Sequence, residues 1–263
     1  MADFYFKKKY GQNFLRNTSV VNSIVEKSEI PSDTLVLEVG PGQGALTCKL
    51  AEYAKQVVCY EIDSDLETTL INLQKKYPNV HINFGDFLDR NIELDIEKYD
   101  FKHVYFISNV PYYITTPILM KLMDSDVKIE KVVMMVQKEV GDRFSALPGS
   151  KNYSSITVFL NYFYNVKKLL NVGRNEFYPV PNVDSEVICF ELKDNKEYLK
   201  DDTFFFKLVR DSFKFKRKTI RNNLKNYDLS KIESVLKKYN FDLSTRAEQL
   251  PVSVFVELSN ELV

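Results

Sequence analysis

The chain has 263 residues, of which 44% are hydrophobic and 27% charged, so it can form packed cores and is not intrinsically disordered. Its 36 basic residues balance 36 acidic ones, which argues against indiscriminate nucleic-acid binding through overall charge. No apolar run reaches the roughly 20 residues of a membrane span, and the first residues lack a signal-peptide core. Three scattered cysteines and two histidines predict neither a disulfide framework nor a zinc cluster. We therefore expect a cytoplasmic protein with no metal and no membrane partner.

Five β-rich apolar runs in the first half of the chain predict strands. They are TLVLEVG (34–40), QVVCYEID (56–63), VHINFGD (80–86), HVYFISN (103–109) and KVVMMVQ (131–137). Segments with helical spacing, such as ALTCKLAEYA after the first run, separate them. Strands that alternate with helices are typical of a parallel sheet with helices on both faces.

The second half of the chain changes character. The runs SITVFLNYFY (155–164) and SEVICFEL (185–192) predict two more strands, which would suit an antiparallel pair at one sheet edge. The polar stretch KDNKEYLKDD (193–202) reads as a linker, and the segments beyond it have helical spacing only. We expect an α/β domain over residues 1–192, with a mostly parallel seven-stranded sheet, and a helical domain over 193–263.

A glycine-rich loop, LEVGPGQGALT (37–47), joins the first predicted strand to a helix. Glycines at 40, 42 and 44 let the backbone turn sharply and approach a ligand closely. Their spacing is not GxGxxG, and no Lys-Ser/Thr pair follows to make a phosphate-binding P-loop. Taken alone, the loop is explained as well by a tight strand-to-helix turn as by a ligand site.

Acidic residues at the ends of the next two strands favour a ligand site. Glu61 follows Gly40 by 21 residues, the spacing at which an acid accepts hydrogen bonds from ribose hydroxyls in nucleoside-binding α/β folds. Asp86 ends the third strand, where it can accept from an adenine amino group. Each acid alone could be a helix-capping or turn residue. Together they mark the strand ends at which such sheets bind ligands.

The fourth strand ends in the turn NVPYYITTP (109–117), which combines acceptors with a flat ring. Asn109 offers an amide oxygen and Val110 a backbone carbonyl, while Pro111 has no competing N–H and stiffens the turn. Two fixed acceptors suit an amino group with two hydrogens, and Tyr112 offers a face on which a base can stack. The alternative is a strand-ending turn with buried aromatic rings, and we expect packing alone for Tyr113.

With these segments in view, the chain resembles the KsgA-type ribosomal RNA small-subunit adenine dimethyltransferases, a branch of the S-adenosylmethionine-dependent methyltransferases. Nine segments occur in the family's order, nearly end to end: GQNFL, LEVGPGQGALT, YEID, GDF, NVPYYITTPI, VQKEVGDR, FYPVPNVDS, KRKTIRNNL and RAEQLPVSVFVELSNEL. The resemblance implies a Rossmann-like class I methyltransferase sheet. It also implies a monomer that dimethylates two adjacent adenines near the 3′ end of small-subunit rRNA, within a pre-30S particle during ribosome biogenesis.

The resemblance also implies roles for individual residues. Those that would contact S-adenosylmethionine are Asn13, Leu15, Gly40, Gly42, Glu61, Ile62, Asp86 and Asn109. Those that would serve catalysis are Asn109, Val110, Pro111, Tyr112 and Phe177. The target adenine would lie between the rings of Tyr112 and Phe177. The chain departs from the family pattern at Asn17, Val110 and Ser154, where an acid, leucine and glycine are more common.

A basic stretch lies in the predicted helical domain. Residues 205–225 contain eight lysines and arginines against one acid, a net charge of +7. On a helical wheel several of the basic residues share one flank beside an apolar stripe of Phe213, Ile220 and Leu224. A solvated helix face would explain the charge, but the resemblance implies RNA contacts, for which the candidates are Lys214, Arg217, Lys218, Arg221 and Lys225. The run KKK (7–9) is a second candidate, with a basic tail as its plainer explanation.

Three other functions are considered. A large-subunit rRNA adenine methyltransferase of the antibiotic-resistance branch would use the same turn, but RNNL and the C-terminal segment favour the small-subunit enzyme. A non-catalytic RNA-binding or transcription-factor relative would not need Glu61, Asp86 and the 109–112 turn intact. A dehydrogenase is disfavoured by the glycine spacing and the aromatic turn.

Overall fold

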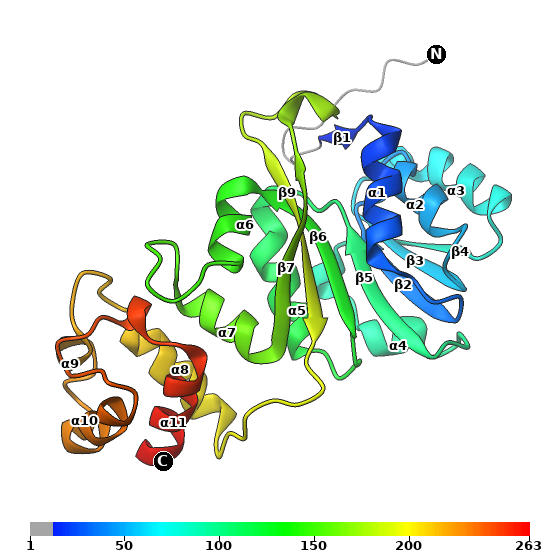
Figure 1. Cartoon of the computed structure of the whole chain (residues 1–263). Coiled ribbons are helices and arrows are strands. Elements are labelled where there is room, and N and C mark those ends of the chain that lie inside the picture. The colour runs from blue at the N-terminus through cyan, green and yellow to red at the C-terminus, as the bar shows by residue number, and fades with distance from the viewer. Residues whose placement is uncertain (1–12) are drawn as a thin grey trace. The chain divides into compact units, whose positions relative to one another are not determined.

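In the computed structural model, which describes residues 13–263, a seven-stranded sheet organises the first part of the chain (Figure 1). Its spatial strand order is β4-β3-β2-β5-β6-β9-β7. The strands are β2 (Thr34–Val39), β3 (Gln56–Glu61), β4 (Val80–Phe84), β5 (His103–Ser108), β6 (Lys131–Gln137), β7 (Tyr164–Val172) and β9 (Ser185–Leu192). Neighbours from β4 to β6 pair in parallel, and β9 pairs antiparallel with β6. The predicted α/β class and mostly parallel sheet with an antiparallel edge are confirmed.

Helices and short turns connect the strands and cover the sheet. The α-helices of this part are α1 (Thr18–Ser28), α2 (Ala45–Leu50), α3 (Glu67–Lys76), α4 (Ile92–Ile96), α5 (Thr115–Asp124) and α6 (Lys138–Phe144). The 3-10 turns are η2 (Ser64–Leu66), η3 (Phe87–Asp89), η4 (Tyr112–Ile114) and η5 (Arg174–Glu176). A separate two-stranded sheet pairs β1 (Phe14–Leu15) antiparallel with β8 (Phe177–Tyr178).

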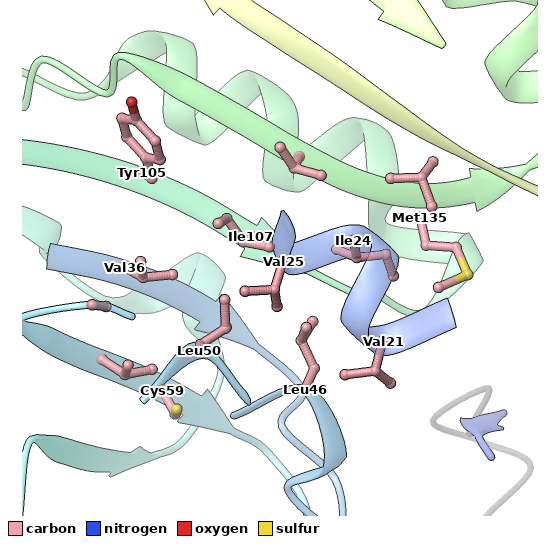
Figure 2. Packing of buried hydrophobic residues seen from close by; sticks show 14 of the residues in the cluster. Val21, Ile24, Val25, Val36, Leu46, Leu50, Cys59, Tyr105, Ile107 and Met135 are labelled. Atoms are coloured by element: carbon pink, nitrogen blue, oxygen red, sulfur yellow. The ribbon is translucent and has the colours of Figure 1, made fainter. Parts of the chain in front are cut away.

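The core lies on both faces of the sheet because successive strand residues point to opposite sides. On one face, Val21, Ile24 and Val25 of α1 pack with Leu46 and Leu50 of α2 over the central strands (Figure 2). The strand residues of this cluster include Val36, Cys59, Tyr105, Ile107 and Met135. On the other face, the ring of Phe87 lies 4.9 Å from Tyr60 and 6.2 Å from Phe106, centre to centre.

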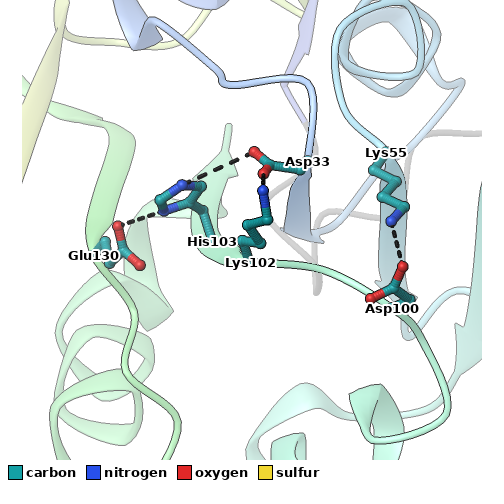
Figure 3. Close-up of polar contacts among 6 residues, drawn as sticks. All are labelled: Asp33, Lys55, Asp100, Lys102, His103 and Glu130. Atoms are coloured by element: carbon teal, nitrogen blue, oxygen red, sulfur yellow. Dashed lines mark hydrogen bonds and ion pairs between the residues drawn. The ribbon is translucent and has the colours of Figure 1, made fainter.

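Ion pairs gather at the amino ends of the strands (Figure 3). Asp33, just before β2, pairs with Lys102 at 2.9 Å, and His103 at the start of β5 contacts Glu130 at 2.9 Å. Lys55, just before β3, pairs with Asp100 at 2.6 Å. Since parallel strands share their direction, these pairs lie at the edge opposite the strands' carboxyl ends. We therefore regard them as contacts that fix the starts of the strands.

By its internal contacts the chain divides into two compact units. One contains Met1–Gly141 and Lys167–Glu191, and the other Asp142–Val166 and Leu192–Val263. The second unit contains α7 (Ser155–Phe163), α8 (Asp202–Ser212), α9 (Ile220–Asn223), α10 (Leu229–Lys238), η6 (Ala247–Gln249) and α11 (Val252–Leu262). The division differs from the predicted boundary at residue 192, because residues 142–166 group with the helices.

The predicted strand at 155–164 is wrong, since this segment forms α7. Thr157 Oγ1 accepts a hydrogen bond from the Ser154 backbone N–H at 3.2 Å, which caps the helix start. Phe159 and Tyr162 of α7 pack their rings against Phe205 of α8, at 6.3 and 5.1 Å between centres. Short apolar runs do not distinguish a strand from a buried helix, and here packing against α8 decides. The actual strand, β7, comes next and was not predicted.

Candidate active site

The ends of four parallel strands meet at one edge of the sheet and enclose a pocket of about 260 Å³. Gly40 follows β2, Glu61 ends β3, Asp86 follows β4 and Asn109 follows β5. Of the predicted site residues, these line the pocket: Asn13, Leu15, Gly40, Gly42, Glu61, Ile62, Asp86, Asn109, Val110, Pro111 and Tyr112. The structure therefore brings together residues that the sequence spreads over about a hundred positions.

The glycine loop needs its glycines for both conformation and space. Gly40 and Gly42 have φ values of +71° and +58°, in the left-handed region that residues with a Cβ disfavour. A Cβ on Gly42 would lie 2.5 Å from Cε1 of Phe14, and one on Gly40 would lie 3.8 Å from Cδ of Pro111. The loop is thus packed between the β1 segment and the 109–112 turn.

Glu61 is a buried carboxylate that the backbone fixes in place. Its Oε2 accepts from the Gly42 N–H at 3.2 Å and its Oε1 from the Asp63 N–H at 2.9 Å. Burial raises the pKa of Glu61, and these two backbone donors oppose the rise. A carboxylate oxygen has a second lone pair, so both oxygens keep an acceptor position for ribose hydroxyls in the pocket.

Asp86 has a capping role and also lines the pocket. Its Oδ1 accepts from the Leu88 N–H at 2.9 Å at the start of η3. Asp86 can therefore serve both as a turn residue and as a ligand contact, because one of its oxygens caps the turn while the side chain lines the pocket. The same position allows Asp86 to accept from an amino group of a bound nucleoside.

A further acid, Glu38, lines the pocket and was not assigned a role from sequence. It is 2% exposed and its Oε2 lies 3.6 Å from the Cys59 thiol. No lysine, arginine or histidine in the described part of the chain pairs with it, and burial raises the pKa of Glu38 to about 7. Among residues 13–263, the pocket lining then holds three carboxyl groups, those of Glu38, Glu61 and Asp86, against one cation, Arg16. This balance fits a cationic nucleoside such as S-adenosylmethionine.

The turn after β5 presents acceptors to the pocket. Asn109 Nδ2 donates to the Asn13 carbonyl at 3.4 Å, which leaves its Oδ1 as an acceptor. Across residues 13–263 nothing donates a hydrogen bond to the Val110 carbonyl. Ser108 Oγ donates to the Val39 carbonyl at 2.6 Å and accepts from the Val39 N–H at 3.3 Å, so β5 is fastened to β2 next to the turn.

Of the three rings named in the predictions, Tyr113 and Phe177 lie elsewhere than expected. Tyr112 lines the pocket, half-buried, and its hydroxyl lies 2.7 Å from Ser185 Oγ. Tyr113, for which we expected packing alone, is 57% exposed and also lines the pocket. Phe177 does not line it: this ring is 2% exposed and belongs to the core cluster around α1. Its neighbour Tyr178 lines the pocket instead and is 44% exposed.

The structure thus places Phe177 in the core cluster and Tyr178 at the pocket, and the stacking role of Phe177 stays a prediction. Residues 177 and 178 form β8, and neighbouring residues of a strand point to opposite sides. The pairing of β8 with β1 sets Phe177 inward and Tyr178 outward. The guanidinium of Arg16 lies 3.8 Å from the centre of the Tyr178 ring, so a cation stacks on this ring at the pocket wall.

The family departures at Asn17 and Ser154 have local explanations. Asn17 Oδ1 accepts from the Ser19 N–H at 2.8 Å and caps α1, while its Nδ2 donates to Glu176 at 2.7 Å. Ser154 is the cap of α7. At position 110 the side chain is 2% exposed, so valine fills a buried site there.

The basic residues of the helical unit do not lie on one continuous helix, so the helical-wheel prediction is wrong. Helix α8 ends at Ser212 and α9 covers only Ile220–Asn223. Arg217 and Lys218 lie in the turn between the two helices and Arg221 in α9. All five candidates are exposed: Lys214, Arg217, Lys218, Arg221 and Lys225. The KKK run at 7–9 falls outside the described residues.

Comparisons with known proteins identify a family for this chain. The chain matches the family described as ribosomal RNA adenine dimethylase over residues 3–263. It is 40% identical to ribosomal RNA small subunit methyltransferase A of Bacillus pumilus, covering 98% of this chain and 92% of that protein. It is 42% identical to the protein of the same name in Bacillus mycoides, covering 99% and 92%.

Two solved structures share the architecture. A dimethyladenosine transferase from Plasmodium falciparum is 27% identical with a TM-score of 0.79, covering 93% of this chain and 95% of that one. The 23S rRNA methyltransferase ErmE is 26% identical with a TM-score of 0.76, covering 95% and 99%. No helix within residues 13–263 combines the length and apolar character required to cross a membrane. From its site, its fold and its full-length match, the chain belongs to the ribosomal RNA adenine dimethylase family.

Proposed function

We propose that this protein dimethylates the exocyclic amino groups of two adjacent adenines near the 3′ end of small-subunit rRNA, with S-adenosylmethionine as methyl donor. The observation that carries the proposal is the shared pocket. It joins the carboxylates of Glu61 and Asp86 to the acceptors of the 109–112 turn at one edge of the sheet. The small-subunit methyltransferases at 40–42% identity support this choice of substrate.

The pocket residues divide between the cofactor and the target base. Glu61 would accept hydrogen bonds from the ribose hydroxyls and Asp86 from the adenine amino group of the cofactor. Gly40 and Gly42 let the backbone approach the cofactor closely, and Asn13 and Leu15 line the same pocket. When bound, S-adenosylmethionine supplies an electrophilic methyl group.

The turn prepares the target amine. Asn109 Oδ1 and the Val110 carbonyl accept its two hydrogens, which favours a pyramidal nitrogen with its lone pair directed out of the ring. The same acceptors stabilise positive charge on the nitrogen as it attacks, an electrostatic preorganisation. Pro111 keeps a competing N–H away from the Val110 carbonyl. The nitrogen then releases its proton to water, so no general base with a shifted pKa is needed.

Aromatic rings hold the extruded adenine. Stacking on Tyr112 is worth roughly 1–3 kcal/mol, enough to offset much of the cost of base extrusion. Since Phe177 is buried, Tyr178 is the exposed ring of the 177–185 segment that can contact a bound base. We therefore assign the second stacking role to Tyr178.

The exposed cations of the helical unit are proposed RNA contacts. Arg217, Lys218 and Arg221 form no ion pair within the described chain, so their charge is available to phosphates. Such contacts supply affinity and salt dependence rather than sequence choice. We further propose that the substrate is rRNA within a pre-30S particle, in the cytoplasm, and that the protein acts as a monomer.

One experiment tests the proposed activity directly. Purified protein is incubated with labelled S-adenosylmethionine and isolated 30S or 50S particles from cells that lack the modification. We expect label in the 30S rRNA. Label confined to 50S rRNA would instead assign the protein to the branch of ErmE. This is the second candidate function, and the structural similarity to ErmE, with a TM-score of 0.76, supports it. Absence of label together with absence of cofactor binding would favour a non-catalytic RNA-binding relative.

A further inference from the structure

The ring of Tyr112 needs a support outside its own turn. The 3-10 turn that carries it, η4, has only three residues, and Thr115 Oγ1, just after the turn, donates to the Tyr112 carbonyl at 3.1 Å. That bond holds the backbone and leaves rotation of the ring open. The contact that reaches the end of the ring is the hydroxyl pair between Tyr112 and Ser185 Oγ at 2.7 Å.

Ser185 is a fixed point in the fold. It is 1% exposed, begins β9 and pairs in register with Gln137 of β6. The preceding residue, Asp184, is held on both sides: its carbonyl accepts from the Lys138 N–H at 2.9 Å and its Oδ1 from the Arg174 N–H at 3.0 Å. The Ser185 hydroxyl is therefore carried by the sheet and is independent of the 109–112 turn.

The Tyr112 phenol is suited to a lasting bond with this anchor. Burial raises the pKa of Tyr112, so its hydroxyl stays protonated at neutral pH. A neutral hydroxyl both donates and accepts, and so does the Ser185 hydroxyl, so the pair can form in either direction. Tethering the hydroxyl limits rotation about the Cα–Cβ bond, because that rotation would swing the hydroxyl away from Ser185, and so it fixes the direction in which the ring extends.

We propose that Ser185 is a positioning residue for methyl transfer: it holds the Tyr112 ring at the position from which the stacked adenine presents its amine to Asn109 and Val110. This inference rests on the proposed function, because it assumes that Tyr112 stacks on the target base. It also gives the segment 177–185 a role in the site other than the one predicted for Phe177. The bond joins the antiparallel edge of the sheet to the target-binding turn.

The test is a double-mutant cycle on single-turnover methyl transfer to undermethylated 30S particles. Tyr112→Phe keeps the stacking ring and Ser185→Ala keeps the backbone, so each removes only one half of the hydroxyl pair. We expect each single variant to lower the rate about tenfold, and the double variant to lower it by the same factor. Ser185→Thr, which restores a hydroxyl, should recover most of the rate.

Two further measurements separate positioning from simple structural support. Cofactor affinity by calorimetry and the melting temperature should change little in Ser185→Ala. As matched control, Ser28→Ala removes another buried serine bond of 2.7 Å, from its hydroxyl to the Ile24 carbonyl in α1, away from the pocket. It should leave the transfer rate at the wild-type value. With 2-aminopurine at the target position of a reconstituted particle, Ser185→Ala should weaken the fluorescence quenching that stacking produces.

The outcomes distinguish the inference from the proposed function. If wild-type protein methylates the particles and Ser185→Ala matches it in rate and quenching, the positioning role is wrong. A double variant whose transfer rate is lower by about a hundredfold, the product of the two single effects, would also overturn it. The two hydroxyls would then act separately. Wild-type protein that transfers no methyl to the particles would instead overturn the proposed function.

Discussion

Glu38 should make the stability of the protein depend on pH around neutrality. Its carboxyl lines the pocket, is buried and has no cationic partner in the described chain, and burial raises its pKa from 4.5 to about 7. Between these two values the folded protein binds a proton that the unfolded chain has released. The free energy of unfolding therefore falls as pH rises from about 4.5 through 7. The stabilisation is complete below about 4.5, the pKa of Glu38 in the unfolded chain. It is lost above about 7, the pKa of Glu38 in the folded protein.

The size of this effect follows from the pKa difference. Each pKa unit corresponds to 1.36 kcal/mol, so the shift amounts to about 3 kcal/mol. Glu38→Gln removes the titrating group at nearly constant volume. We therefore expect the variant to gain about 3 kcal/mol relative to wild type as pH rises from 4.5 to 8. Urea unfolding of both proteins across this range measures the difference, and parallel pH profiles would refute the reasoning.

Three further predictions concern the site and its surroundings. Asn109→Ala should lower methyl transfer at least a hundredfold, because one of the two acceptors is lost, and should leave cofactor binding measurable by calorimetry. Gly42→Ala should weaken cofactor binding at least tenfold and lower the melting temperature, because its φ is +58° and the added Cβ meets the Phe14 ring. Replacing Arg217, Lys218 and Arg221 together by alanine should reduce the salt slope of rRNA binding by roughly 2–3.

Matched variants control each of these predictions. Asn79→Ala removes an amide that bonds two backbone carbonyls outside the pocket, and should not affect transfer. Gly149→Ala has a φ of +87° but nothing within 4 Å of the added Cβ, so it isolates backbone strain from the clash with Phe14. For the cations, alanine at the lysines of α3, Lys75 and Lys76, removes exposed charge elsewhere. An unchanged salt slope in the triple variant would exclude these three residues as phosphate contacts.

The sheet and the positions of its strand ends could be predicted from sequence because the signals are local. Buried parallel strands produce continuous apolar runs, and glycine, acid or amide residues follow them directly. The order of strands then brings Glu61, Asp86 and Asn109 to one edge without any further information. The failure at residues 155–163 has the opposite cause, since that run becomes a helix through its contacts with α8, which are remote in sequence.

Side-chain direction was harder to predict than position. Phe177 and Tyr178 are adjacent aromatic residues in a two-residue strand, and only pairing with β1 decides which one faces the pocket. The contribution of Ser185 was equally hidden, because it depends on a contact across 73 residues. Its only sequence signal was its place at the end of the family segment FYPVPNVDS.

The central claim is tested most directly by mapping the methylated nucleotides after the purified protein has reacted with undermethylated small subunits. Mass spectrometry of rRNA fragments reports both the position and the number of methyl groups. The account predicts two adjacent adenines near the 3′ end, each carrying two methyls on its amino nitrogen. Methylation of a single adenine, of large-subunit rRNA only, or of no nucleotide at all would contradict it.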